Sequence, residues 1–178
     1  MIKQLVNYLT ILRIFLAFII FVLLMSKEGY VLALFLFFIA GITDYADGYL
    51  ARRYQATSSL GEILDPIADK ILIVFIIFAL AVNLSSYLIA FMGSLIISRE
   101  IWVSALRDYN SRNNNHEATK VTYLAKIKTT VQLFTISIFL IGITFGKMIL
   151  IVFGDIFLII SAIITIYTGY EYTIKTFK

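Results

Sequence analysis

Long apolar stretches, separated by short groups of charged residues, run along most of this chain. Uncharged stretches occupy residues 14–26, 29–43, 71–98 and 129–146, and also 148–170 apart from Asp155. The longest of them, 71–98, is interrupted by the polar run 83–86 and therefore predicts two helices joined by a tight turn. Taken together, the pattern predicts six membrane-spanning helices, at about 7–26, 30–52, 58–82, 86–109, 120–145 and 148–174.

Several of the uncharged stretches are shorter than the roughly 20 residues that a spanning helix needs. The helices are therefore expected to continue into the charged segments 44–70 and 99–128, which would then lie at helix ends near the membrane boundary. Six spans leave little of the 178 residues for anything else. We expect a single membrane-embedded catalytic domain over residues 1–178.

Composition supports this interpretation. Apolar residues make up 61% of the chain and charged residues 15%, whereas a soluble domain is nearer half apolar and a quarter charged. The core of a soluble domain of 178 residues could not bury so much apolar surface, which excludes a water-soluble enzyme. The high apolar content also excludes a disordered chain. The chain has no cysteine and one histidine, which excludes disulfides and a structural zinc site. The fold class is an all-α integral membrane protein.

Lysine and arginine predict the orientation. On six spans, Lys27 and Lys147 fall on one side of the membrane and all the other Lys and Arg residues on or near the opposite side. The positive-inside rule places both termini and the charged segments on the cytoplasmic side of a multi-pass protein of the plasma membrane. The first apolar stretch shows no small-residue cleavage pattern and is interpreted as a retained span. Trp102 and the tyrosines fit the membrane interface, so membrane lipids rather than nucleic acid are the expected surroundings.

Four carboxylates are concentrated in one charged segment. Asp44 and Asp47 are three residues apart, and Asp65 and Asp69 are four apart, so each pair lies on one face of its helix. Consecutive antiparallel helices would bring the pairs together at the membrane boundary, where unneutralised charge is costly. Lysine or arginine could neutralise them, but oxygen ligands at this density suit two Mg²⁺ or Mn²⁺ ions better. A proton or ion relay and a divalent-cation transporter are the alternatives.

Glycines lie beside both carboxylate pairs. Gly48 follows Asp44 by one helical turn and Gly61 precedes Asp65 by one turn, and each removes a side chain where a ligand could approach the backbone. Arg52 offers a planar fork for a phosphate. A two-metal site with such neighbours is suited to gripping a phosphate and stabilising attacking and leaving oxygens.

These residues form one continuous pattern, D-x2-D-G-x2-A-R-x8-G-x3-D-x3-D. Its fixed positions are Asp44, Asp47, Gly48, Ala51, Arg52, Gly61, Asp65 and Asp69. The pattern resembles the signature of the CDP-alcohol phosphotransferases. Asn7, Thr10 and Arg13 are similar to the family's N-x-x-T-x-x-R on the first helix.

The resemblance implies a role for each position. Asp44, Asp47 and Asp65 would hold one divalent metal ion, and Asp44, Asp65 and Asp69 would share a second. Asp69 would also be the catalytic base that accepts the proton of the acceptor hydroxyl. The nucleotide part of CDP-diacylglycerol would be bound by Asn7, Thr10, Gly48, Arg52, Ser58 and Gly61. The resemblance also suggests a homodimer in which each subunit holds its own site.

A second polar segment points to the acceptor substrate. Arg99 and Arg107 are eight residues apart, on roughly one helical face, and Lys126 and Lys128 open the fifth span. Cations facing a phosphate-transfer site suit an anionic acceptor, whereas the alternative is attraction to anionic lipid headgroups. The segments around these residues resemble the bacterial phosphatidylglycerophosphate synthase branch of the family, which implies glycerol 3-phosphate as acceptor. Inositol phosphate, serine and a non-catalytic lipid-binding role are the remaining alternatives, and Asp155 has no assigned role.

Overall fold

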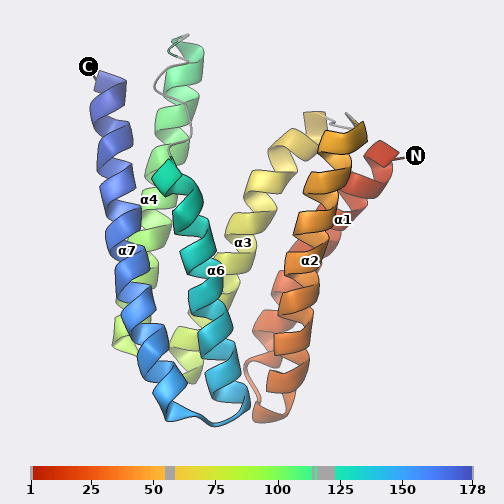
Figure 1. Cartoon of the computed structure of the whole chain (residues 1–178), viewed down its shortest axis with the longest axis vertical. Coiled ribbons are helices and arrows are strands. Elements are labelled where there is room, and N and C mark those ends of the chain that lie inside the picture. The colour runs from red at the N-terminus through yellow and green to blue at the C-terminus, as the bar shows by residue number, and fades with distance from the viewer. Residues whose placement is uncertain (1, 55–58, 114, 116–122, 178) are drawn as a thin grey trace.

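The computed structural model describes residues 2–54, 59–113, 115 and 123–177, and within these ranges it leaves out the side chains of a few helical residues, among them Asp47, Arg52 and Lys126. The described residues form six long α-helices and one short 3-10 helix (Figure 1). The elements are α1 (Ile2–Leu23), η1 (Lys27–Gly29), α2 (Tyr30–Tyr54), α3 (Ser59–Asn83), α4 (Tyr87–Arg112), α6 (Tyr123–Thr144) and α7 (Met148–Phe177).

The six predicted helices are confirmed, and most of their ends differ from the expected ones by only a few residues. The largest difference is at the start, because α1 begins at Ile2 rather than near residue 7. The predicted tight turn between α3 and α4 is also present. Ser85 adopts a φ of 48°, and the hydroxyl of Ser86 caps α4 by accepting a hydrogen bond from the backbone N–H of Ile89.

Four segments of the described chain are long and apolar enough to cross a membrane, namely Lys27–Ala46, Tyr87–Arg112, Ile127–Thr144 and Met148–Phe177. α1 contributes a shorter apolar stretch, Asn7–Leu23. α3 is not among the four, but it packs along α1 in the same bundle. Both chain ends lie at the same end of the bundle, as an even number of spans requires (Figure 1).

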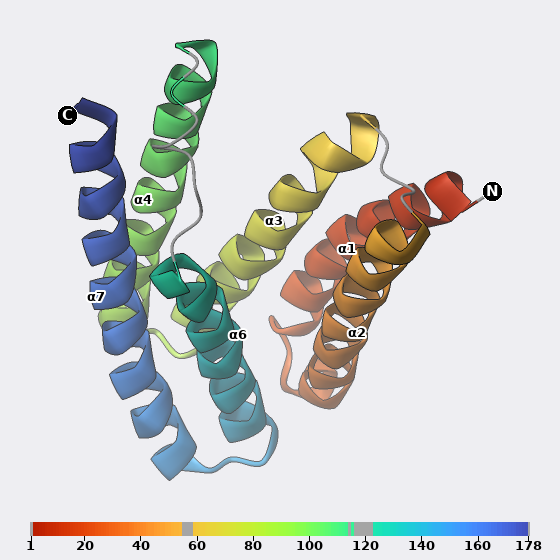
Figure 2. The same cartoon turned by 45° about the horizontal axis from the view of Figure 1, so that its top comes forward.

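The bundle consists of two groups of three helices. α1 packs on α2 and on α3, which makes the N-terminal group, and α7 packs on α4 and on α6, which makes the C-terminal group. The groups meet where α3 contacts α4 and α6, and where α2 contacts α6. They diverge toward the end that carries the chain termini, most visibly between α3 and α4 (Figure 2).

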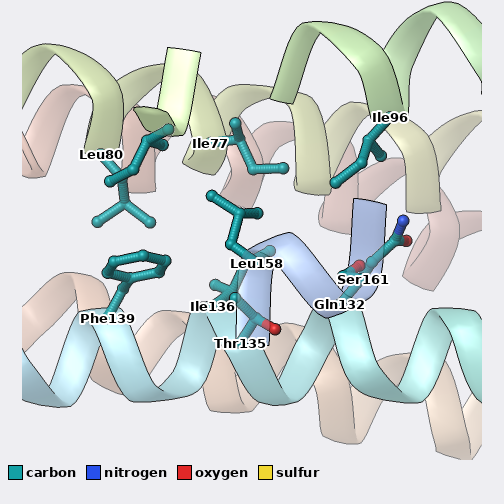
Figure 3. Close-up of a pocket in the computed structure, with 10 residues that line it drawn as sticks. Ile77, Leu80, Ile96, Gln132, Thr135, Ile136, Phe139, Leu158 and Ser161 are labelled. Atoms are coloured by element: carbon teal, nitrogen blue, oxygen red, sulfur yellow. The ribbon is translucent and has the colours of Figure 1, made fainter. Parts of the chain in front are cut away.

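A well-filled apolar core joins the two groups away from the termini. Ile76 and Leu80 of α3 and Phe139 and Leu140 of α6 are almost fully buried in one continuous cluster. The cavity beside this cluster is only about 10 Å³, no more than the space that one water molecule needs (Figure 3). The groups are thus firmly packed at one end, and the large opening between them lies at the other.

Candidate active site

The acidic cluster is Asp44 of α2 with Asp65 and Asp69 of α3, and α1 lies against all three. Arg13 of α1 is the central contact, since its side chain is only 1% exposed and its Nη1 reaches two carboxylates. That nitrogen lies 2.8 Å from Oδ1 of Asp44 and 2.6 Å from Oδ1 of Asp69. One guanidinium therefore draws carboxylates from two different helices to the same point.

Thr10 lies one helical turn before Arg13 and contacts the third member of the cluster. Its hydroxyl donates a hydrogen bond of 2.6 Å to Oδ1 of Asp65. The three-residue spacing puts Thr10 and Arg13 on one face of α1, and both side chains are buried. The family resemblance includes Arg13 in a motif without giving it a role, whereas in the structure Arg13 contacts two of the carboxylates directly.

The donor chemistry of the acidic cluster fits divalent cations. Among the described side chains the three carboxylates outnumber the cations Arg13 and Lys70, so negative charge remains, and every candidate ligand atom is an oxygen. Within the described side chains no group of three or more is already arranged as a metal site. The side chain of Asp47, which would complete the predicted set, lies outside the described residues, although its backbone follows Asp44 by one turn of α2.

The predicted nucleotide-binding residues lie around the same helix ends. Asn7 precedes Thr10 by one turn of α1, Gly48 follows Asp44 on α2, and Gly61 is buried in the first turn of α3. Ser58 and the side chain of Arg52 fall outside the described residues. Each described member therefore lies one helical turn from a residue of the acidic cluster or from its partner Thr10, while contacts with a nucleotide stay a prediction.

A cavity of about 910 Å³ separates the two helix groups next to the acidic cluster. Asp44 and Asp69 line it from the N-terminal group, together with Lys70. The cationic wall opposite comprises Arg99, Arg107 and Lys128 of the C-terminal group; the side chain of Lys126 is outside the described residues. Three of the four predicted acceptor-binding residues thus face the same space as the carboxylates.

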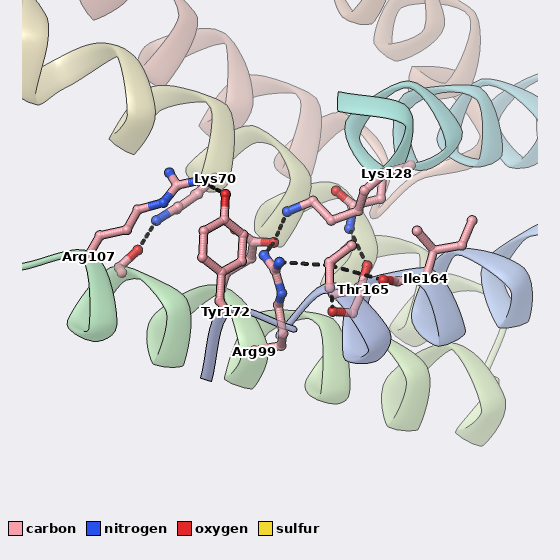
Figure 4. Close-up of polar contacts among 11 residues, drawn as sticks. Lys70, Arg99, Arg107, Lys128, Ile164, Thr165 and Tyr172 are labelled. Carbon is pink, nitrogen blue, oxygen red and sulfur yellow. Dashed lines mark hydrogen bonds and ion pairs between the residues drawn. The ribbon is translucent and has the colours of Figure 1, made fainter. Parts of the chain in front are cut away.

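Buried and partly buried polar contacts hold the cationic wall in place, although Arg107 itself is exposed (Figure 4). Oε1 of Glu100 accepts hydrogen bonds from Nζ of Lys128 and from Nη1 of Arg99, the latter at 3.0 Å. Arg99 also donates to Oγ1 of Thr168 at 2.8 Å, and Nη2 of Arg107 donates to the hydroxyl of Tyr172 at 3.1 Å. Lys70 donates across the cavity to the hydroxyl of Ser104. A single carboxylate, Glu100, therefore pairs with two buried cations, and α7 contacts both arginines.

Sequence analysis missed several of these partners. Glu100 had no role because it stands beside Arg99 in a segment with many charges. Thr168 and Tyr172 lie in the last apolar stretch, which contains several threonines and tyrosines that the sequence alone does not distinguish. For the two α7 residues, only the packing of α7 against α4 distinguishes them from their neighbours.

The sequence profile of the CDP-alcohol phosphatidyltransferase family matches residues 3–167. The chain therefore belongs to this family of membrane enzymes, which agrees with the acidic pattern and its position beside a cavity. Among similar proteins is the CDP-diacylglycerol–glycerol-3-phosphate 3-phosphatidyltransferase of Rickettsia felis, 41% identical over 96% of this chain and 93% of the relative. Proteins of the same name from Rickettsia typhi and Haemophilus influenzae are 39% and 36% identical, over 96% and 71% of this chain and 95% and 69% of the relatives.

Proposed function

We propose that this protein transfers the phosphatidyl group of CDP-diacylglycerol to sn-glycerol 3-phosphate, which gives phosphatidylglycerol phosphate and CMP. The observation that carries the proposal is the cavity with carboxylates on one wall and three cations on the other. Divalent cations bound by the acidic wall, which is the side of the cavity that carries Asp44 and Asp69, would contact the transferred phosphate. The cationic wall would bind the phosphate of the acceptor. The names of the similar proteins support this choice of donor and acceptor.

Asp44, Asp47, Asp65 and Asp69 would together hold two divalent cations, Mg²⁺ or Mn²⁺. Bound there, such cations would neutralise charge on the pyrophosphate and on the departing CMP. Arg13 and Thr10 hold the carboxylates of three of these residues in place before substrate arrives. Asn7, Gly48, Arg52, Ser58 and Gly61 would bind the CDP part, with the acyl chains left in the bilayer.

In the transfer step, the 1-hydroxyl oxygen of glycerol 3-phosphate attacks the phosphorus that carries diacylglycerol. A new P–O bond forms, the P–O bond to CMP breaks, and the hydroxyl proton passes to Asp69. Asp69 is suited to this role because it lines the cavity and Arg13 fixes one of its oxygens. Arg99, Arg107, Lys126 and Lys128 orient the acceptor by its phosphate, so that the hydroxyl points at the acidic wall.

Cation transport, the alternative from another class, is less well supported by this cavity. A divalent ion passing between the helix groups would face Arg99, Arg107 and Lys128 directly. Repulsion by these like charges opposes such a pathway. The same three cations favour a substrate that brings its own negative charge.

The site is expected on the cytoplasmic side of the plasma membrane, where glycerol 3-phosphate is dissolved and CMP can leave. The distribution of lysine and arginine supports that orientation. A homodimer is also expected from the family resemblance. Chemical cross-linking in native membranes checks the dimer, and protease accessibility of the chain ends checks the orientation.

CMP release from CDP-diacylglycerol by the detergent-purified protein tests the proposed reaction. The assay compares Mg²⁺ with EDTA, and offers glycerol 3-phosphate, inositol phosphate, serine or no acceptor. Metal-dependent release with glycerol 3-phosphate alone is the expected result. Release only with another alcohol would overturn the acceptor assignment, and no release with any acceptor would overturn the proposed function.

A further inference from the structure

The C-terminal half of α7 carries a buried polar face that the proposed reaction leaves unused. Thr165, Thr168, Gly169 and Tyr172 are all buried on this helix, three or four residues apart. They share one face of α7, which packs against α4 and α6. Neither Thr168 nor Tyr172 is among the described residues that line the large cavity. Any influence on substrate would therefore pass through another side chain.

Arg99 lies directly on this face of α7. Thr168 accepts a hydrogen bond from its Nη2, and Gly169 leaves room for its aliphatic stem. A Cβ atom at Gly169 would come within 2.9 Å of Cγ and 3.3 Å of Nε of Arg99. Because a real side chain would displace it, the glycine is required for Arg99 to follow this path.

Tyr172 contacts both arginines of the cationic wall. Its hydroxyl accepts the bond from Arg107, and its ring centre lies 5.2 Å from Cζ of Arg107 and 5.9 Å from Cζ of Arg99. Figure 4 shows the ring standing between the two side chains. An aromatic ring between two guanidinium groups attracts each of them and offsets part of their mutual repulsion.

The ring itself cannot move far. Tyr172 is 1% exposed and packs with Val103 and Leu106, which lie on α4 between Arg99 and Arg107. The element that carries the arginines therefore also clamps the tyrosine that orients them. A clamped partner fixes the direction of two long and otherwise flexible side chains before a ligand binds.

We propose that Tyr172, supported by Thr168 and Gly169, is a positioning residue that sets the two arginines of the cationic wall to bind the phosphate group of the acceptor substrate. The proposal rests on the proposed function, in which that wall receives glycerol 3-phosphate. It adds a specificity role to the last helix, where the sequence showed no functional motif. Tyr172 is buried behind the wall and orients the groups that contact the substrate.

Steady-state kinetics of three variants tests the proposal. Tyr172→Leu removes ring and hydroxyl, Tyr172→Phe removes only the hydroxyl, and Tyr170→Leu is the matched control, since Tyr170 is 65% exposed on the same helix. Loss of a hydrogen bond to a charged group and of the ring contact is expected to raise KM for glycerol 3-phosphate about tenfold in Tyr172→Leu. Tyr172→Phe is expected to show about a threefold rise. KM for CDP-diacylglycerol, and kcat, are expected to stay near their wild-type values in both.

A merely structural role for Tyr172 predicts a different pattern. In that case kcat and both KM values would worsen together, in step with the thermal unfolding midpoint. That pattern would overturn the proposal, as would an unchanged KM for glycerol 3-phosphate in Tyr172→Leu.

A binding measurement separates failure of this proposal from failure of the proposed function. Inorganic phosphate is expected to raise the unfolding midpoint of the wild type and of Tyr170→Leu, but not of Tyr172→Leu. That result would support the positioning role even if glycerol 3-phosphate released no CMP, which would overturn only the proposed reaction. Equal stabilisation by phosphate in the wild type and in Tyr172→Leu would overturn the positioning role, whatever the turnover.

Discussion

The two walls of the cavity are assembled from the sequence in opposite ways. The acidic wall comes from consecutive helices, and its carboxylates lie within residues 44–69. The cationic wall takes Arg99 and Arg107 from α4 and Lys128 from α6, and it depends on α7 for contacts that hold the arginines. A short segment thus carries the chemistry of one wall, while the other is built from three helices distant in sequence.

The walls also differ in how their charge is balanced. On the acidic wall the three carboxylates of the acidic cluster outnumber two cations, Arg13 and Lys70, so negative charge is left over. On the cationic wall one carboxylate, Glu100, contacts two cations, so positive charge is left over. Each wall is therefore prepared for a ligand of the opposite sign, cations on one side and a phosphate on the other.

The largest effect is expected from Asp69→Asn on the acidic wall. Because the amide cannot accept the hydroxyl proton, the substitution is expected to lower kcat by about a thousandfold. CMP release with saturating substrates measures it. Asp155→Asn is the matched control, because Asp155 is a carboxylate of α7 outside both walls, and its activity is expected to stay at the wild-type value. Wild-type turnover in Asp69→Asn would remove the proposed base.

Arg13→Gln is expected to affect stability and metal dependence together. Removing the buried guanidinium leaves two carboxylates facing each other, at a cost of about 2 kcal/mol in the free energy of unfolding, less than for a fully buried pair because both carboxylates are half exposed. Added Mg²⁺ is expected to raise the thermal unfolding midpoint of this variant more than that of the wild type, since the cation replaces the lost positive charge. Equal stabilisation of the two proteins by Mg²⁺ would contradict a shared role of Arg13 and metal in balancing the cluster.

The fold was largely predictable because its signal is repeated along the whole chain. Apolar stretches recur between charged segments, and a polar break such as 83–86 marks its turn without further information. The described ends of α2 and α3 lie close to those expected for this reason. The extension of α1 to Ile2 was missed, because Lys3 and Gln4 interrupt the apolar pattern before Asn7.

The site was predictable only as far as its residues lie near one another in sequence. Asp44 and Asp69 could be paired because short spacings fix helical faces and a short turn joins the helices. The contacts of Arg13 with both, and of Tyr172 with two arginines, join residues more than thirty positions apart. Such contacts depend on how helices pack, and no local spacing encodes them.

On the cationic wall, Arg107→Ala is expected to act on one substrate. Because a phosphate loses a forked, charged donor, KM for glycerol 3-phosphate is expected to rise about thirtyfold, with KM for CDP-diacylglycerol unchanged. Arg112→Ala is the matched control on the same helix, since that arginine is exposed and paired with Asp108 at 2.7 Å. An equal rise in both KM values would mean that the cationic wall does not bind the acceptor selectively.

The smallest effect is expected where neither wall is involved. Asn83, at the end of α3, donates hydrogen bonds of 2.7 Å to the backbone oxygen of Leu24 and 2.6 Å to the hydroxyl of Tyr30. Asn83→Ala is expected to lower the free energy of unfolding by about 1–2 kcal/mol because both acceptors lose their donor.

Kinetics distinguish this variant from those of the walls. The contacts of Asn83 tie α3 to the connection between α1 and α2, at the end of the bundle away from the cavity, so both KM values are expected to match the wild type. Thermal unfolding in detergent and substrate titrations measure the two quantities on the same preparation. A selective change in either KM would show that the closed end of the bundle is coupled to the cavity. Substrate binding by the two walls would then depend on the packing that joins the two helix groups.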